Sequence, residues 1–184
     1  MDSFVFSLGD VVHDLVTGRV ALDGLDLAGM DGVVVKKLGD QANSWSRLRL
    51  HPLRALEAAG VRVFSPADTI ELAVDRYRMT MILAMWGLPL PVTLAAESES
   101  SIRAAISTVD EAVVKPVYTS KGRGMVRVGS GRDPLAPLWS DEPASGRYLV
   151  QRFVEAPGRD IGVTVVGGRC IGAFYRVAEP GQWT

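Results

Sequence analysis

A lysine and a basic loop lie close together in the middle of the chain. Lys115 follows the apolar run Ala112-Val113-Val114, and Ser120-Lys121-Gly122-Arg123-Gly124 begins five residues later. An ammonium group at the end of a buried strand needs a negative partner. Glycines let backbone N–H groups approach phosphate oxygens, while lysine and arginine neutralise the phosphate charge. This stretch therefore predicts a phosphate-binding arrangement, although a β-hairpin with a solvated basic turn fits the same residues.

The better-known phosphate loops do not match this stretch. The chain contains no G-x-x-x-x-G-K-[ST] sequence. Gly122 and Gly124 have the first spacing of a dinucleotide-binding fingerprint, but Arg127 stands where the third glycine belongs, and no long helix follows. A phosphate site here would therefore be of another kind.

A second candidate half-site follows a later apolar strand. Gln151-Arg152-Phe153-Val154 comes directly after Tyr148-Leu149-Val150, and Asp160 follows six residues later. An exposed strand end can offer backbone N–H and C=O groups to an adenine edge, with Phe153 or Val154 against the ring. The carboxylate of Asp160 could accept hydrogen bonds from ribose hydroxyls. The alternative is that Asp160 only caps a turn.

The elements that must position these residues fall into three sections, 1–66, 67–146 and 147–184. In the first section, strands alternate with a helix that stops at Gly60, which indicates α/β layering. The expected strands there are 11–16, 33–35 and 61–64, and Leu53, Leu56 and Ala59 mark the helix.

In the second section, apolar residues recur at helical spacing and predict a helix whose methionine-rich stripe packs in the core. The stripe is Ile70, Val74, Tyr77, Met81 and Met85. A second helix is expected over 98–107, strands over 112–116 and 125–128, and a loop over 129–146. In the third section, a strand over 148–153 precedes a hairpin of 161–166 and 169–176, joined by Gly167-Gly168.

Composition gives no support to several classes of function. The 184 residues carry a net charge of −1 with acids and bases interspersed, so nothing favours a nucleic-acid or polybasic membrane partner. No apolar run approaches the roughly 18 residues of a membrane span. The single Cys170 fits a reducing, cytoplasmic setting. His13 and His51 lie far apart and are interpreted as ordinary residues rather than metal ligands.

The order of these pieces resembles the ATP-grasp superfamily, and within it the RimK-like glutamate ligases. The nearest likeness is to ligases that add glutamate to the pterin coenzyme tetrahydromethanopterin. The resemblance covers about residues 31 to 184, and each motif is weak alone. The matching stretches are Phe64-Ser65-Pro66-Ala67, Asp75 to Thr80, Gly87 to Thr93, Val114-Lys115-Pro116, Ser120 to Gly124, Gln151 to Val154, Asp160-Ile161, Val165 to Arg169, Arg176 and Gly181 to Thr184.

The resemblance implies an α/β (α+β ATP-grasp) fold that joins a carboxylate to an amine with ATP and Mg²⁺. The three sections would be a partial pre-ATP-grasp domain (1–66), the small or lid subdomain (67–146) and the start of the C-terminal subdomain (147–184). The substrates would be ATP, glutamate or a similar amine, and a carboxylate acceptor. Self-association stays open.

The resemblance also implies roles for individual residues. Lys115 would contact the ATP phosphates and could also reach the adenine side, and Ser120 to Gly124 would be a mobile lid over the phosphates. Gln151 to Val154 would be the adenine hinge, and Asp160 would face the ribose. Arg176 would lie near the γ-phosphate or the acceptor carboxylate.

Three departures from the family pattern bear on the expected activity. Arg76, which the resemblance implies would contact the nucleotide, follows Asp75 where the family usually has lysine. Gly162 follows Asp160-Ile161 where the family often has arginine. The chain stops at Thr184, before the Asp and Glu-x-Asn residues that hold magnesium in the family, and it lacks the usual first strand and helix. A truncated chain is therefore expected, with magnesium ligands beyond Thr184.

The alternatives to the ligase are a non-catalytic ATP-grasp remnant that binds nucleotide or a partner, and an unrelated α/β binding domain.

Overall fold

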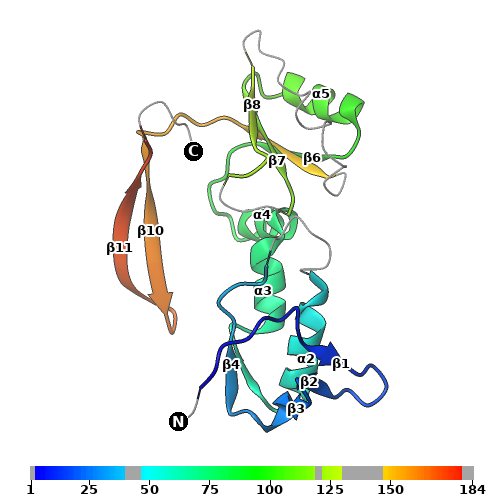
Figure 1. Ribbon diagram of the computed structural model, residues 1–184. Helices are drawn as coiled ribbons and strands as arrows, with labels where there is room; N and C mark the ends of the chain where they lie inside the picture. The colour runs from blue at the N-terminus through cyan, green and yellow to red at the C-terminus, as the bar shows by residue number, and fades with distance from the viewer. Residues whose placement is uncertain (1–2, 40–46, 119–121, 130–146, 180–184) are drawn as a thin grey trace.

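The computed structural model describes residues 3–39, 47–118, 122–129 and 147–179. Four sheets are formed by these residues: a three-stranded sheet β1-β2-β3, a parallel pair β4-β5, a four-stranded sheet of order β6-β9-β7-β8, and a hairpin β10-β11 (Figure 1). The mixed α/β class expected from the sequence is confirmed. No helix in the described ranges has the length and apolarity needed to cross a membrane.

The N-terminal part has its own apolar core. Strands β4 (Gly32–Val34) and β5 (Arg62–Phe64) are parallel, with Val33 opposite Val63. The helix α2 (Leu50–Ala58) connects them, as a crossover between parallel strands requires. The strands predicted over 33–35 and 61–64 and the helix between them are thus confirmed within a few residues. The core residues are Val20, Leu27, Val33, Leu38, Leu50, Leu53, Leu56, Val61, Val63 and Ala67.

The strand predicted over 11–16 is wrong beyond its first half. Only β1 (Val12–His13) pairs with β2 (Val20–Leu22), which in turn pairs with β3 (Leu25–Asp26) ahead of the short 3-10 helix η1 (Leu27–Gly29). Asp14 Oδ1 accepts hydrogen bonds from the N–H groups of Val16 and Thr17, at 2.9 and 3.2 Å.

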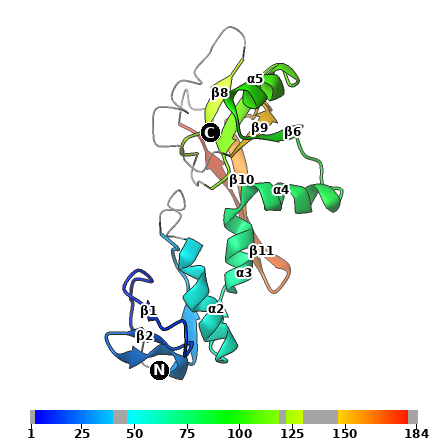
Figure 2. The same cartoon turned by 90° about the vertical axis from the view of Figure 1, so that its right-hand side faces the viewer.

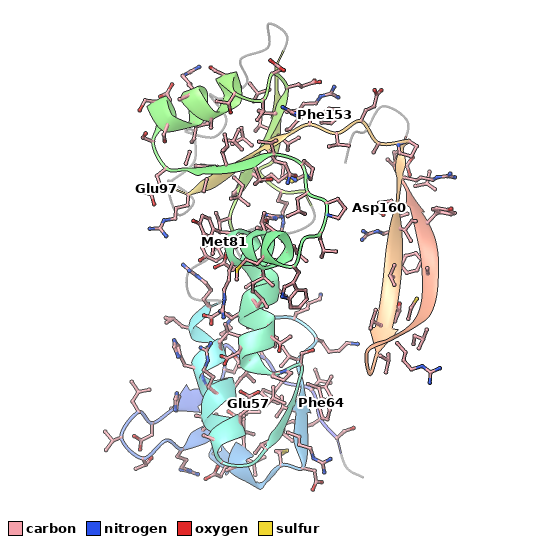
Figure 3. All side chains as sticks on the ribbon, turned by 180° about the vertical axis from the view of Figure 1, so that it is seen from behind. Glu57, Phe64, Met81, Glu97, Phe153 and Asp160 are labelled. Carbon is pink, nitrogen blue, oxygen red and sulfur yellow. The ribbon has the colours of Figure 1, made fainter. Side chains whose placement is uncertain are left out.

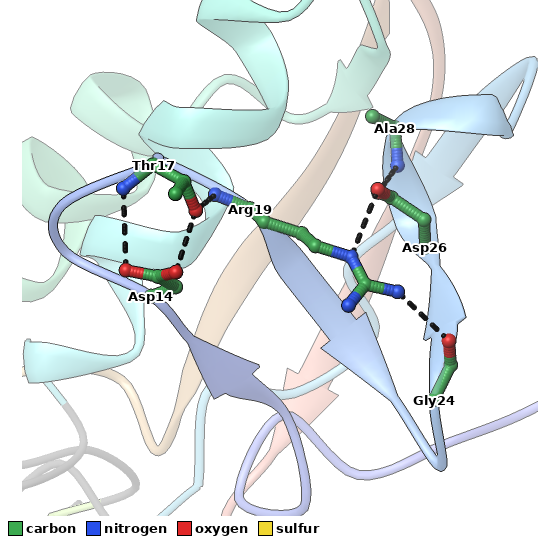
Figure 4. Close-up of polar contacts among 6 residues, drawn as sticks. All are labelled: Asp14, Thr17, Arg19, Gly24, Asp26 and Ala28. Carbon is green, nitrogen blue, oxygen red and sulfur yellow. Dashed lines mark hydrogen bonds and ion pairs between the residues drawn. The ribbon is translucent and has the colours of Figure 1, made fainter.

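Figure 4 shows the contacts of Asp14 with Thr17 beside the ion pair of Arg19 with Asp26. The same contacts hold the pKa of Asp14 below its ordinary value, the Thr17 hydroxyl most of all. An Asp side chain that takes local N–H groups favours a turn over a strand.

The predicted helix over 70–85 is two helices. α3 (Ala67–Val74) ends at Asp75, whose carboxylate then caps α4 (Arg76–Met85) by accepting from the N–H of Arg78 at 2.9 Å. The expected packing of the methionine stripe in the core holds for Ile70 and Val74 on α3 but is wrong for its members on α4, because no residue of α4 is buried. Met81 is 49% exposed and Met85 79% exposed.

The four-stranded sheet has two different faces. Its strands are β6 (Thr93–Ala96), β7 (Ala112–Pro116), β8 (Val126–Val128) and β9 (Tyr148–Arg152), and all neighbours are antiparallel. One face packs on α5 (Glu99–Ser107), the helix predicted over 98–107, which Ser98 caps. The residues of this core are Ala96, Ile102, Ala105, Val109, Ala112, Val114, Val128, Tyr148 and Val150. Since side chains alternate along a strand, the residues between these point to the opposite face.

The predicted hairpin is confirmed. β10 (Arg159–Val166) and β11 (Arg169–Val177) are joined by Gly167 and Gly168, which have φ angles of 56° and 76°. Two successive residues with positive φ form the turn that matches the twist of a hairpin. In the views of Figures 1 and 2 the hairpin extends away from the four-stranded sheet, and nearly all of its residues are exposed.

Candidate functional site

A pocket of about 210 Å³ lies on the face of the four-stranded sheet that α5 does not cover. Val113 and Lys115 on β7, and Gln151 on β9, alternate with the residues packed on α5, so they point into it. The pocket is smaller than the roughly 300–1,000 Å³ of most ligand sites, so it has room for one ring-sized group. It is lined by Pro91, Val113, Lys115, Met125, Gln151, Arg152, Phe153 and Val154.

Lys115 is half-buried and its ammonium has a neutral partner. Lys115 Nζ donates to Oε1 of Gln151 at 2.6 Å. Burial lowers the pKa of Lys115, and the nearby positive charge of Arg76 lowers it further. Among the described residues, no carboxylate forms an ion pair with this lysine. The part of the chain that the structure describes therefore holds the ammonium at the pocket without a carboxylate to balance its charge.

Arg76 ties the start of α4 to the end of β7. Its Nη1 donates to the carbonyl of Pro116 at 2.6 Å, and its backbone N–H donates to the carbonyl of Val117 at 3.4 Å. Tyr118 adds a hydrogen bond from its hydroxyl to Asp75 at 3.2 Å. Burial lowers the pKa of Arg76, but an arginine remains charged. Two partly buried cations therefore lie near one another at this end of β7.

The last residue of β9 and the residue after it form backbone hydrogen bonds with neighbouring segments. The N–H of Arg152 donates to the carbonyl of Val92 at 2.8 Å, and that of Phe153 donates to the carbonyl of Glu111 at 2.7 Å. The N–H of Val154 has no partner among the described residues. A ring in the pocket could therefore use the N–H of Val154, but not those of the two residues before it.

The ring of Phe153 is covered on one face by an arginine. The guanidinium of Arg127, on β8, lies 3.6 Å from the ring centroid. Glu111 fixes that guanidinium, with its Oε1 2.7 Å from both Nε and Nη2. Sequence reasoning noted Arg127 only as the residue that breaks a glycine pattern, and its stacking on Phe153 could not be read from the spacing.

The basic loop is described only in its second half. Ser120 and Lys121 lie outside the described residues, so the predicted lid stays a prediction. Gly122 and Gly124 have φ angles of 72° and 66°, which disfavour other residues. A Cβ on Gly124 would also lie 3.1 Å from Cγ of Pro116, so this glycine allows the turn to approach the end of β7. Arg123 is exposed.

The other two predicted site residues are not in this pocket. Asp160 and Arg176 face each other across β10 and β11, and Nε and Nη2 of the arginine donate to the two carboxylate oxygens at 2.6 and 2.7 Å. Figure 3 shows Asp160 on the hairpin, apart from Phe153 at the four-stranded sheet. The structure thus brings Lys115 together with Gln151 to Val154, and Arg76 close by, but it does not bring the hairpin pair to them.

The pocket also contains residues that sequence reasoning did not select. Val113 and Met125 line it, and Pro91 closes one side. The alternation within 112–116 was a usable signal for Val113, because it stands two residues before Lys115. For a metal the fit is poor: the described ranges contain no group of three or more His, Cys, Asp or Glu side chains that could hold one.

Comparison with known proteins shows the family. Residues 81–183 match the family described as prokaryotic glutathione synthetase, ATP-grasp domain. The tetrahydromethanopterin:alpha-L-glutamate ligase of Methanosarcina acetivorans is 37% identical over 172 positions, which cover 85% of this chain and 52% of that protein. The chain thus spans about half the length of the curated relatives it matches.

Solved structures agree on the fold. A RimK domain ATP-grasp protein from Sphaerobacter thermophilus has a TM-score of 0.62 at 22% identity, over 83% of this chain and 59% of that one. D-alanyl-alanine synthetase A from Vibrio cholerae has a TM-score of 0.63 at 15% identity, over 93% of this chain and 52% of that one. Because the family match covers more than half of its residues, this chain belongs to the ATP-grasp family.

Proposed function

We propose that the chain forms the adenine and phosphate end of the nucleotide site of an ATP-dependent carboxylate–amine ligase. The observation that carries the proposal is the half-buried ammonium of Lys115, which lies near Arg76 and has a neutral amide as its partner. A buried charge without a counter-ion is costly, and a bound anion removes that cost. Phosphate groups are the anions that an ATP-grasp site is built to receive.

The pocket accounts for the adenine end of the nucleotide. Val113, Met125 and Phe153 supply apolar walls, and the N–H of Val154 supplies a donor for a ring nitrogen. In this arrangement the base fills the pocket and the phosphates extend past Lys115 toward the turn that contains Gly122 and Gly124. The proposed division into sections 1–66, 67–146 and 147–184 places this site between the second and third sections.

The proposed reaction forms an amide in two steps. A carboxylate oxygen of the acceptor attacks the γ-phosphorus of ATP, the bond to the β–γ bridging oxygen breaks, and ADP leaves. The amine then attacks the acyl carbon of the acylphosphate, phosphate leaves, and the nitrogen loses a proton. The names of the relatives support glutamate as the amine. The residues of this chain would bind the base and neutralise phosphate oxygens, which favours attack by positioning and charge.

Magnesium is expected in an ATP site because it bridges phosphate oxygens and offsets their charge. The described residues offer no cluster for it, so we assign it no ligand here. A reducing, cytoplasmic setting for the protein stays part of the proposal, supported by its single cysteine.

Calorimetry with three ligands tests the nucleotide site. We expect ADP to bind the 184-residue chain more tightly than either adenosine or pyrophosphate, because ADP engages both the pocket and Lys115. Equal affinity for ADP and pyrophosphate would reduce the site to a general anion site. Absence of ADP binding would refute the proposal. ADP binding without ADP release from ATP, when glutamate and candidate acceptors are supplied, would favour the non-catalytic rival for this chain.

A further inference from the structure

A series of hydrogen bonds begins at Lys115 and ends at the backbone of the segment before β6. Lys115 Nζ donates to Gln151 Oε1 at 2.6 Å, and Gln151 Nε2 donates to Thr93 Oγ1 at 2.8 Å. Thr93 Oγ1 then donates to the carbonyl of Pro91 at 2.9 Å. Thr93 and Gln151 are direct partners in the register of β6 and β9, so their side chains share the face of the sheet that carries the pocket.

The donors and acceptors present fix the direction of each hydrogen bond in this series. A threonine hydroxyl has one hydrogen, and the carbonyl of Pro91 can only accept, so that hydrogen belongs to the Pro91 contact. The hydroxyl oxygen must therefore accept from Gln151, and the amide nitrogen must face Thr93. The amide oxygen then faces Lys115, which can only donate while it is charged. Each end of the Gln151 amide thus has one compatible partner, which selects one of its two flipped orientations.

We propose that Thr93 is a positioning residue for the nucleotide site, acting through Gln151 to hold the ammonium of Lys115 at the pocket. The inference rests on the proposed function, in which Lys115 receives phosphate. A lysine has a flexible four-carbon stem, and the charge of Arg76 repels its ammonium. The fixed oxygen of Gln151 opposes both tendencies. Without the hydroxyl of Thr93, the Gln151 amide nitrogen loses its acceptor and the side chain is free to rotate.

The contribution of the hydroxyl can be separated from that of the packing. Valine has nearly the shape of threonine and fits a strand equally well, so Thr93→Val removes the hydrogen bonds and keeps the sheet. Thr93→Ser keeps the hydroxyl and removes a methyl group. Thr164→Val on the exposed hairpin is the matched control.

The first arm of the test measures ADP affinity by calorimetry on the full chain. Thr93→Val should weaken binding by about threefold to tenfold, the loss expected for one hydrogen bond. Thr93→Ser and Thr164→Val should stay near the parent. In a Gln151→Met background, Thr93→Val should cause no further loss, because its effect passes through the amide. An equal loss in Thr93→Ser, or an undiminished loss in the Gln151→Met background, would overturn the inference.

The second arm needs no nucleotide. The chain has four lysines, so the ¹³Cε signal of Lys115 can be assigned by its disappearance in Lys115→Arg. Thr93→Val should shift the titration of this signal to lower pH, since the ammonium loses its fixed acceptor, while Thr93→Ser should leave it unchanged. An unchanged titration in Thr93→Val would overturn the inference. If the parent chain failed to bind ADP, the proposed function would fall, and this arm alone would decide the role of Thr93.

Discussion

Lys115 and Arg176 are both cations for which the sequence suggested a role at the phosphates, and their surroundings differ. Lys115 is half-buried on the pocket face of the four-stranded sheet, near Arg76, with a neutral amide as partner. Arg176 lies on the exposed hairpin and is paired through two hydrogen bonds with Asp160. Within the described residues, Lys115 has no carboxylate partner and is partly shielded from water, whereas Arg176 has a carboxylate partner and is exposed to water.

This difference shows where a ligand can gain most. An exposed ion pair contributes little to the free energy of folding, because water already stabilises each charge and screens the attraction between them. A partly buried cation next to another cation destabilises the free protein. A bound anion removes this unfavourable energy, and its removal adds to the binding affinity. The four-stranded sheet, rather than the hairpin, should therefore dominate nucleotide binding by this chain.

The largest effect is expected from Lys115→Met, which keeps the length of the side chain and removes its charge. ADP affinity should fall by about tenfold to a hundredfold, equivalent to about 1.5–3 kcal/mol for a charged hydrogen bond. The free energy of unfolding of the free protein, measured in urea, should increase, since burial and Arg76 both disfavour the ammonium. Lys36→Met, at an exposed position, is the control for loss of one surface charge. Matching ADP affinities in the two variants would remove Lys115 from the site.

Local patterns in the sequence were enough to place much of this sheet. The apolar runs predict β7 and β9, the pair Gly167-Gly168 predicts the hairpin turn, and the apolar spacing within 98–107 predicts α5, because each of these signals depends on neighbouring residues. Lys115 was recognised in the same way, since a lysine at the end of an apolar strand is unusual in itself.

The features that local patterns missed depend on distant contacts. Asp75 ends one helix and begins another while its carboxylate also accepts from Tyr118, which is 43 residues away. The helical spacing continues through this break, so the spacing could not reveal it. The contact of Thr93 with Gln151 spans 58 residues and requires the register of β6 with β9. The sequence contains both residues but does not show that they face each other.

The pH dependence of binding should separate the two regions next. A bound phosphate stabilises the ammonium and raises the pKa of Lys115, so ADP affinity should be highest below the lowered pKa of the free protein and should decline as pH rises through it. Arg76, the other cation near this group, stays protonated in that range. Across the same window the free energy of unfolding should rise with pH, because the unfolded chain, with an ordinary lysine, binds more protons there.

Calorimetry and urea denaturation from pH 7.5 upward would measure both slopes. The lower limit avoids titration of phosphate groups, whose second pKa is about 6. Lys115→Met should have a nearly flat binding profile in this range. A parent profile as flat as that of the variant would mean that the Lys115 ammonium is not what the nucleotide contacts.

A smaller effect is expected from the arginine that covers Phe153. Arg127→Met removes a cation–π contact of about 0.5–1 kcal/mol, which should weaken ADP binding by about twofold to fivefold as the ring loses its support. The hairpin supplies a matched control in Arg159, which stacks on Tyr175 at 4.5 Å. Arg159→Met should leave ADP affinity unchanged. If both variants weakened binding equally, the contrast between the two regions would be lost.

The smallest effect is expected from the pair on the hairpin. Asp160→Asn keeps the shape of the side chain and removes the charge that holds Arg176, in a place where both side chains are more than half exposed, at 61% and 63%. The free energy of unfolding should not change measurably, because water replaces the lost contact. ADP affinity should fall less than in Lys115→Met, since Asp160 does not line the pocket. The family resemblance assigns Asp160 to the ribose, and calorimetry of Asp160→Asn tests that assignment directly. A loss as large as that of Lys115→Met would show that the hairpin contacts bound nucleotide, and it would place Arg176 within reach of the phosphates.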